Sequence, residues 1–232
     1  MRIHSAATTV SSWTGEFRYT PSVFVQPESV EDIVQVVKDR ETFPSPVRAV
    51  GSNHSTVPVG DPDGGTLVDM RGMNRILNID EHSVRVEAGA LYIDVAKELE
   101  RRNLQLPQNP IIGNLTVGAA ASTGTKDAAL PDEFGQLSSY AHAMTLVDAS
   151  GKVIEVNEDD DPELMQVLRS SYGALGIIVD VTFRVKPLQL IEVTHREVPF
   201  SELRTAIPAL LEEDASQLLF IYPFIDSMTV ET

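Results

Sequence analysis

The sequence predicts a globular fold that mixes α-helices with β-strands, and three observations support this. Hydrophobic residues make up 42% of the 232 residues, the content of an ordinary globular protein. Residues 23–50 read as a strand, a helix and a second strand in succession. Residues 142–156 read as two strands joined by a tight turn. A chain of this length can form one large domain or two small ones.

The strand–helix–strand unit begins with an apolar strand over Val23–Val25. Ser29, followed three positions later by Asp32, is typical of a helix N-terminus with a capping-box variant. The apolar residues after it recur at helical spacing and are Val30, Ile33, Val34 and Val37. This helix is expected to stop near Phe43-Pro44, and the next strand to cover Val47–Val50.

Further elements follow the same kind of reasoning. Strands are predicted over Thr66–Met70 and Val84–Ala88, and an amphipathic helix runs from Leu91 to Asn103. After the turn Gly173–Gly176, a mostly buried strand is predicted over Ile177–Val185.

The composition shifts at Pro187, and we expect one domain over residues 1–187 and the start of another over residues 188–232. In the second part, Leu190–Val193 and Leu218–Tyr222 read as strands and Ser201–Glu212 as a helix. Because so few elements can bury only a small hydrophobic core, residues 188–232 are expected to be the truncated start of a domain whose remainder is absent.

Charge and composition exclude several classes of function. The net charge of −16 disfavours nucleic acid and anionic membrane surfaces as partners, although backbone N–H groups can still hold a phosphate locally. The chain has no cysteine, which excludes disulfides, thiolate metal sites and cysteine nucleophiles. It has no run of roughly 20 apolar residues. Residues 1–13 also lack the apolar core of a secretory signal, so a cytoplasmic location is expected.

The sequence predicts no metal site. No two of the five histidines have the i, i+4 spacing of a helical metal site. The cluster Asp61–Gly65 reads as a plain turn, because Gly72 stands where a calcium loop needs its closing acid. The acidic run Glu158–Asp161 precedes Pro162 and favours the positive end of a helix dipole, with a metal site as the alternative.

The stretch Pro46–Ser55 is the strongest candidate for a ligand site. It reads as an apolar strand that runs into a loop of short polar residues. Gly51 permits a sharp turn, and consecutive backbone N–H groups in such a loop form a concave site for an anion. A bulky ring is unusual inside such a loop, which makes His54 a candidate functional residue.

A second candidate is the segment Gly113–Thr125, which is rich in small residues. Thr116 can cap a short helix whose small side chains let a flat or phosphorylated ligand approach the backbone. The alternative is a tightly packed helix without a ligand. A hydrolase is not favoured: Ala120–Gly124 is close to G-x-S-x-G, but the residues before Ser122 look helical where that motif needs a strand.

Four segments, in order along the chain, are similar to those of FAD-binding (PCMH-type) domains of the vanillyl-alcohol oxidase superfamily. They are Val25–Ile33, Arg48–Ser55, Thr116–Thr125, and Phe134–Ser139 with Ala143–Asp148 and Gly173–Ile177 after it. Over residues 19–187 the chain most resembles sugar-lactone and alditol oxidases, including gulonolactone, arabinonolactone and alditol oxidases. The resemblance implies an α+β domain in which two small subdomains hold an extended FAD between them.

The resemblance also implies which residues contact FAD. The backbone of Gly51–His54 would hold the diphosphate, the small-residue segment would line the flavin, and residues 176–178 would lie beside the adenine. His54 is the candidate for a covalent bond to the flavin 8α carbon, because a neutral imidazole nitrogen is a competent nucleophile. The expected contacts are Arg48, Val50, Gly51, Ser52, Asn53, His54, Ser55, Asn114, Gly118, Ser122, Thr123, Gly124, Gly135, Gly176, Ile177 and Ile178.

The implied activity is transfer of a hydride from a CH–OH group of a sugar lactone, polyol or related substrate to the flavin, with oxygen or another electron acceptor reoxidising it. No catalytic residue is assigned, because the relatives take theirs from the substrate domain. Thr125-Lys126-Asp127 also departs from the Thr-His-Gly of many relatives. One alternative is an FAD-binding module that needs a partner chain to cover the flavin; another is a remnant without cofactor.

Overall fold

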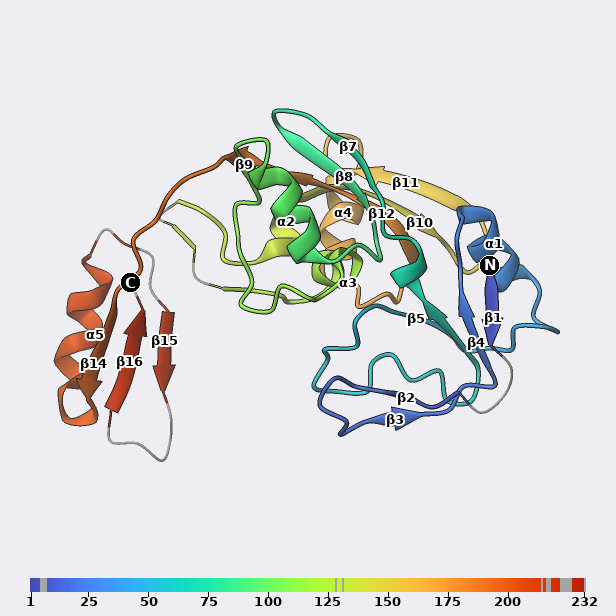
Figure 1. Cartoon of the computed structure of the whole chain (residues 1–232), viewed down its shortest axis with the longest axis horizontal. Helices are drawn as coiled ribbons and strands as arrows, with labels where there is room; N and C mark the ends of the chain where they lie inside the picture. The colour runs from blue at the N-terminus through green and yellow to red at the C-terminus, as the bar shows by residue number, and fades with distance from the viewer. Residues whose placement is uncertain are drawn as a thin grey trace.

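Two β-sheets of different construction form the main body of the protein (Figure 1). The computed structural model describes residues 1–4, 8–127, 129–130, 132–213, 215, 218–221 and 227–231. One sheet has four strands and includes the predicted strand–helix–strand unit; the other has five strands and includes the predicted hairpin.

The four-stranded sheet has the order β1-β4-β6-β5. Its strands are β1 (Arg2–His4), β4 (Val23–Gln26), β5 (Val47–Val50) and β6 (Thr66–Asp69). Both β4 and β5 run parallel to β6, which lies between them, while β1 pairs antiparallel with β4. The carboxyl ends of β5 and β6 therefore meet at one edge of the sheet.

Helix α1 (Val30–Lys38) joins β4 to β5 and begins as predicted: Ser29 Oγ accepts a hydrogen bond from Asp32 N at 3.2 Å. The helix ends at Lys38, however, which is earlier than the predicted stop near Phe43. The carboxylate of Asp39 accepts a hydrogen bond from Thr42 N at 3.2 Å, so the chain turns there and carries Phe43 into the core.

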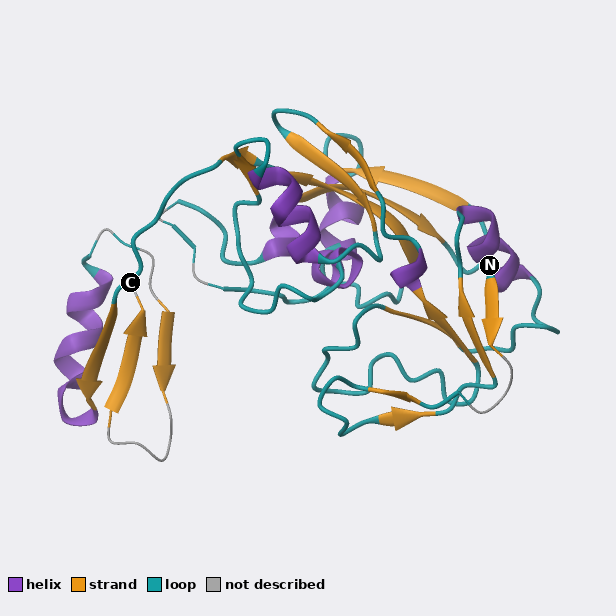
Figure 2. Ribbon diagram, in the orientation of Figure 1, coloured by secondary structure: helices purple, strands orange, loops and turns teal. Residues whose placement is uncertain are grey.

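The five-stranded sheet is antiparallel throughout and has the order β11-β10-β12-β8-β7. Its strands are β7 (Ile76–Ile79), β8 (Ser83–Glu87), β10 (Ala141–Val147), β11 (Val153–Asn157) and β12 (Ile177–Arg184). The helices are α2 (Tyr92–Glu100), α3 (Val117–Ser122) and α4 (Pro162–Leu168). Figure 2 shows these three helices grouped beside this sheet.

A single cluster of buried apolar side chains unites the two sheets. It contains Val25 and Ile33 from the first sheet and its helix, and Val86, Val117 and Val181 from the second sheet and α3. Helix α1 also packs against β10. The main body therefore has one continuous core, which fixes the two sheets relative to each other.

Several short elements connect or cover these sheets. The 3₁₀ turn η1 (Met70–Gly72) follows β6, and the 3₁₀ turn η2 (Leu137–Tyr140) precedes β10. Strand β9 (Leu104–Gln105) pairs with β13 (Lys186–Pro187). Near the N-terminus, β2 (Val10–Ser11) pairs with β3 (Arg18–Tyr19) in a separate two-stranded hairpin.

The C-terminal elements form a smaller unit with its own buried residues. Strands β14 (His195–Pro199), β15 (Leu218–Ile221) and β16 (Ser227–Glu231) make a sheet of order β14-β16-β15. The 3₁₀ turn η3 (Phe200–Glu202) leads into helix α5 (Leu203–Leu211). The buried apolar residues of this smaller unit are Leu210, Met228 and Val230. Figure 1 shows these elements, in orange to red, apart from the two larger sheets.

One prediction in this region is wrong, and another agrees with the structure over the described residues. The predicted strand over Leu190–Val193 is a loop, and Leu190 is 98% exposed. An apolar run forms a strand only when a partner supplies ladder hydrogen bonds, and no described strand pairs with it. The predicted strand Leu218–Tyr222 corresponds to β15, with Tyr222 outside the described residues.

Two kinds of feature are absent from the described part of the chain. None of its helices has the length and apolar character needed to cross a membrane. Within the same residues, no group of three or more His, Cys, Asp or Glu side chains gathers in a metal-binding arrangement.

Candidate functional site

A cavity of about 660 Å³ lies where the two sheets meet, a size within the range of small-molecule and cofactor sites. Three segments line most of it: the loop after β5, helix α3 with the residues that follow it, and the start of β12. The predicted site residues in the lining are Val50, Gly51, Ser52, Asn53, His54, Ser55, Gly118, Ser122, Thr123, Gly124, Gly176 and Ile178.

The loop after β5 is held close to the N-terminal end of α3. A Cβ atom on residue 51 would overlap the hydroxyl oxygen of Thr116 and lie 2.8 Å from its Cβ. Only glycine fits this approach without displacing α3. Two residues later, Asn53 adopts a left-handed backbone conformation with φ of 55°, which reverses the direction of successive N–H groups.

The backbone of this loop is available to a ligand. Within the described part of the chain, the N–H groups of Ser52, Asn53, His54 and Ser55 donate no hydrogen bond. The hydroxyl oxygen of Ser52 is buried and likewise has no partner among the described residues. Unsatisfied polar groups in a folded protein are costly unless a ligand or water satisfies them. The loop therefore fits an anionic group such as a phosphate.

His54 lines the cavity, and its Nδ1 atom is buried without a partner among the described residues. Burial lowers the pKa of His54 below its usual value of 6.5, and a side-chain hydrogen bond with Asn114 acts in the opposite direction. The imidazole is therefore neutral at pH 7, the form in which a ring nitrogen can act as a nucleophile. Asn114 itself does not line the cavity; it is hydrogen-bonded to His54, which does.

Helix α3 supplies a wall of small residues for two reasons at once. A Cβ atom on residue 118 would lie 2.6 Å from Ala88 Cβ, so Gly118 is required by packing against the end of β8. Gly118 also lines the cavity, together with Ser122 and Gly124. The packed-helix and ligand-lining interpretations of this segment are therefore compatible.

Thr116 occupies the N-cap position of α3, but its side chain makes no capping hydrogen bond. The first helical N–H groups are satisfied in another way: Val117 N donates to Ala90 O at 2.9 Å, and Gly118 N donates to Ala88 O at 2.8 Å. These N–H groups are therefore not available to a phosphate, and the loop after β5 is the better anion site.

The start of β12 completes the wall. Gly176 has φ of 152°, and a Cβ atom there would lie 2.5 Å from Val147 O. Ile178 lines the cavity and Ile177 does not, because successive strand residues point to opposite faces. Arg48 and Gly135 also lie outside the lining, so the predicted cofactor contacts of Arg48, Gly135 and Ile177 stay predictions.

The sequence did not single out several neighbours of this site. Trp13, from the hairpin β2–β3, stacks near His54 with ring centroids 5.2 Å apart and planes tilted by 36°. Tyr172, with φ of 50°, lines the cavity next to Ser122, whose carbonyl accepts its N–H at 3.0 Å. Lys126 is the charged side chain in the described lining. Lys126 was noted in the sequence only as part of a departure from the Thr-His-Gly of many relatives, directly after the small-residue segment. The position of Trp13 depends on a long-range contact.

Apolar side chains form another part of the lining that the sequence left unassigned. Ile111 and Ile112 follow the Pro-bearing connector and are both exposed at the cavity, with Val57 and Val59 contributed by the loop after β5. Their exposed apolar surface next to unsatisfied N–H groups suits a ligand with a flat apolar part and an anionic part.

Comparison with known proteins gives the same kind of ligand. The family described as FAD binding domain matches residues 21–157. The chain is 29% identical to L-gulonolactone oxidase of Mus musculus, over 87% of this chain and 43% of that protein. It is also 29% identical to L-gulono-1,4-lactone dehydrogenase of Mycobacterium tuberculosis, over 96% of this chain and 51% of that protein. The chain thus spans about half the length of these curated relatives.

A solved structure shares the fold. A variant of cholesterol oxidase from Brevibacterium sterolicum superposes with a TM-score of 0.81 at 19% identity, covering 100% of this chain and 48% of that one. This likeness confirms the predicted α+β fold class. The residues at the cavity fit FAD, a dinucleotide. Among the described residues, the N–H groups of the loop after β5 have no partner and can bind phosphates, and they lie beside a wall of small and apolar residues.

Proposed function

This chain belongs to the FAD binding domain family, and on that premise we propose that it forms the FAD-holding half of an oxidoreductase acting on CH–OH groups. The substrate class we propose is a sugar lactone, a polyol or a related compound. The support is that the relatives named above are lactone oxidases and dehydrogenases. FAD, when bound, supplies the chemistry by accepting a hydride from the substrate carbon.

The single observation that carries the proposal is the loop after β5. It presents the N–H groups of residues 52–55 and the hydroxyl of Ser52, none of which has a hydrogen-bond partner among the described residues, to a cavity of about 660 Å³. In our proposal these groups hold the diphosphate, while Gly118, Gly124 and Ile178 lie along the remaining length of the cofactor. The same loop is a local anion site in a protein of net charge −16, because the attraction is short-range.

His54 is the attachment point in this proposal. A bond between an imidazole nitrogen and the flavin 8α carbon suits a ring that is neutral at pH 7 and whose buried Nδ1 has no partner among the described residues. In forming the bond, the imidazole replaces one hydrogen of the 8α methyl group. The methyl proton and the imidazole N–H proton would both go to solvent, and the two electrons would go to dioxygen or another acceptor.

The substrate side of the site is the incomplete part of the proposal. We assign residues 1–187 to the FAD-binding domain and residues 188–232 to the start of the substrate domain. No catalytic acid or base is assigned to this chain. The electron acceptor and the cytoplasmic location stay predictions from the sequence.

A second candidate function is an FAD-binding module that needs a partner chain to cover the flavin. The observation that favours it is the exposed apolar segment after β13: Leu190 is 98% exposed and Ile191 is 63% exposed. Exposed apolar residues that are neighbours in the chain can form a contiguous apolar patch, and such patches often mark an interaction surface. In this alternative, flavin reduction by substrate requires the partner.

One experiment tests the proposal. The purified protein is mixed with FAD and freed of excess cofactor, and its spectrum and intact mass are measured before and after acid precipitation. We expect a bound flavin spectrum and, after precipitation, a mass increased by one FAD. Flavin released into the supernatant would contradict the covalent bond to His54, and absence of any bound flavin would contradict the proposal as a whole.

A further assay separates the two candidate functions. The flavin-loaded protein is mixed without oxygen with L-gulono-1,4-lactone or with xylitol, and the absorbance of the oxidised flavin is followed. Bleaching in the absence of other proteins supports an oxidoreductase. Bleaching that appears only with a partner chain supports the module.

A further inference from the structure

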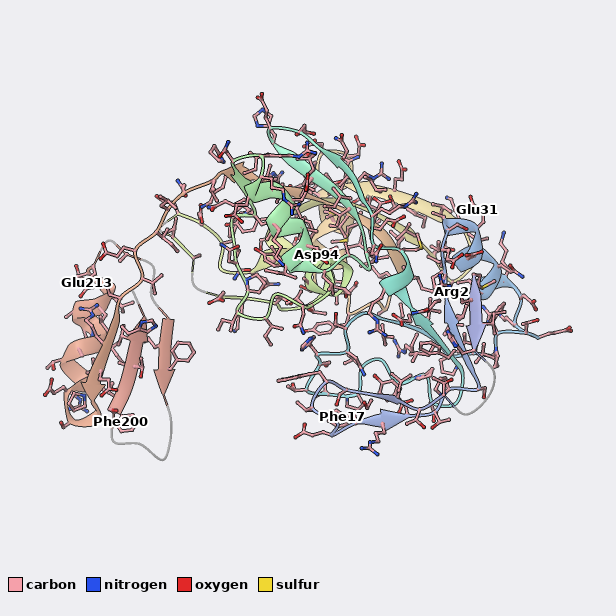
Figure 3. All side chains as sticks on the ribbon, in the orientation of Figure 1. Arg2, Phe17, Glu31, Asp94, Phe200 and Glu213 are labelled. Carbon is pink, nitrogen blue, oxygen red and sulfur yellow. The ribbon has the colours of Figure 1, made fainter. Side chains whose placement is uncertain are left out.

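The hairpin β2–β3 precedes the main sheets and belongs to neither of them. An isolated two-stranded hairpin is at best marginally stable, so contacts with the rest of the protein must hold it. Its turn is fixed internally, because Ser12 N donates to Phe17 O at 2.9 Å and Phe17 N donates to Ser12 Oγ at 3.2 Å. Figure 3 labels Phe17 at this hairpin.

Contacts from the hairpin converge on Asn53, in the middle of the loop after β5. Asn53 Nδ2 donates to Ser11 O at 2.8 Å, and Tyr19 OH donates to Asn53 Oδ1 at 2.6 Å. The backbone carbonyl of Asn53 accepts from Trp13 N at 3.1 Å. The side-chain amide and the carbonyl of Asn53 are thus committed to the hairpin, which leaves only its backbone N–H for a ligand.

Trp13 makes a second, independent contact with His54, the residue that follows Asn53. Its ring centroid lies 5.2 Å from that of His54, with the two planes tilted by 36°. Trp13 is 59% exposed, so it is not a core residue whose position is explained by burial. The contact instead places an aromatic surface beside the imidazole, a geometry that restricts the ring's rotation.

We propose that the N-terminal hairpin is a positioning element for the cofactor loop, with Trp13 as a positioning residue for the His54 ring and Asn53 as the anchor of the loop backbone. This inference rests on the proposed function, because it assigns the loop and His54 to FAD. Neither residue needs to touch the reacting atoms. Asn53 holds the left-handed turn that exposes the N–H groups, and Trp13 limits the orientations of the imidazole.

The test begins without cofactor. The imidazole signals of His54 are identified in the NMR spectrum by their loss in His54→Gln, and are then measured in Trp13→Ala, Trp13→Phe and Leu77→Ala. Leu77 lies on β7 and is a matched control for loss of an exposed apolar side chain. We expect Trp13→Ala to shift the His54 signals, Trp13→Phe to keep most of their position, and Leu77→Ala to leave them unchanged.

A second readout uses FAD itself. We expect Trp13→Ala to weaken the reversible FAD binding that precedes the covalent bond about three- to tenfold, the size of a lost aromatic contact, and Trp13→Phe to restore most of it. Asn53→Gly keeps the left-handed backbone accessible but removes both side-chain hydrogen bonds, and we expect it to weaken binding in the same direction.

The outcomes separate the inference from the function on which it rests. Unchanged His54 signals in Trp13→Ala would overturn the inference, whether or not FAD binds. Equal FAD affinity in wild type, Trp13→Ala and Asn53→Gly would overturn it as well. If the wild-type protein bound no FAD, the proposed function would fail, while the NMR comparison would still decide whether Trp13 positions His54.

Discussion

The backbone of Gly51 packs directly against the side chain of Thr116, so that a Cβ atom on residue 51 would overlap the Thr116 hydroxyl oxygen. This contact joins the two sheets at the cavity: Gly51 follows β5 of the four-stranded sheet, and Thr116 precedes α3, which packs on the five-stranded sheet. The position of the loop after β5 therefore depends on the position of α3.

Gly51→Ala is expected to destabilise the protein by about 1–3 kcal/mol and to weaken FAD binding, because α3 or the loop must move to relieve the overlap. The measurement is the free energy of unfolding in denaturant, together with an FAD titration. Gly124→Ala is the control for the stability measurement, since a Cβ atom there would lie 3.7 Å from Tyr172 OH, an ordinary contact. Equal stability of the two variants would contradict the packing argument.

Local sequence patterns predicted most of the elements that build the site. The periodicity over residues 30–37 and the Ser29 cap gave α1, the turn at residues 149–151 gave the hairpin β10–β11, and the glycines before residue 177 gave the start of β12. Each of these signals lies within a few residues of the element it predicts, where turn and capping chemistry decide the structure.

What the sequence did not give depends on contacts between distant residues. Strand order in the first sheet, with β6 between β4 and β5, follows from pairing that no local pattern encodes. Asn53 was predicted as a cofactor contact, yet its side chain bonds Ser11 and Tyr19 of the N-terminal hairpin. The apolar run at residues 190–193 suggested a strand, but without a described partner strand it is a loop.

The buried carboxylate of Asp180 depends on Arg85. Asp180 is 5% exposed, and its two oxygens accept from Arg85 Nε at 2.8 Å and from Arg85 Nη2 at 3.0 Å. Arg85→Met is expected to cost about 1–3 kcal/mol of folding free energy, because the carboxylate stays buried and, within the described residues, keeps only Thr145 as a side-chain partner. None of the three residues lines the cavity, so FAD affinity should be retained.

Thermal or denaturant unfolding of Arg85→Met measures the cost, and an FAD titration of the same sample measures affinity. Arg75→Met is not a suitable comparison, since it pairs with a different buried carboxylate, Glu87. Arg101→Met is the appropriate control: Arg101 is largely exposed, and its partner Glu98 is partly exposed and keeps Arg102 as a second partner, so this ion pair contributes little. A loss of stability as large in Arg101→Met would refute a specific role for Asp180 burial.

Trp13 provides an internal reporter, because it is the one tryptophan of the sequence and lies beside His54. We expect FAD to quench its fluorescence on binding, since the flavin absorbs where tryptophan emits and would lie in the neighbouring cavity. The titration is followed at the tryptophan emission maximum and corrected with free N-acetyltryptophanamide at the same FAD concentrations. Unaltered emission from protein that has demonstrably bound FAD would place the cofactor away from Trp13.

The pH dependence of stability follows from two histidines. Burial lowers the pKa of His54, and burial together with the charge of Arg184 lowers the pKa of His142. The unfolded chain therefore binds more protons than the folded protein between the lowered pKa values and about 6.5, so stability rises with pH across that window. Stability is expected to fall as the pH is lowered from 7 to 5.

The two histidines can be separated by substitution. His54→Gln and His142→Gln each remove one protonation difference, so each variant should show a flatter stability–pH profile than wild type, and the double variant the flattest. Only His54→Gln should also abolish acid-stable FAD, since His142 does not line the cavity. Denaturant unfolding at half-unit pH steps measures the profile. A His54→Gln profile as steep as that of wild type would show that the imidazole is not held neutral by its place in the cavity wall.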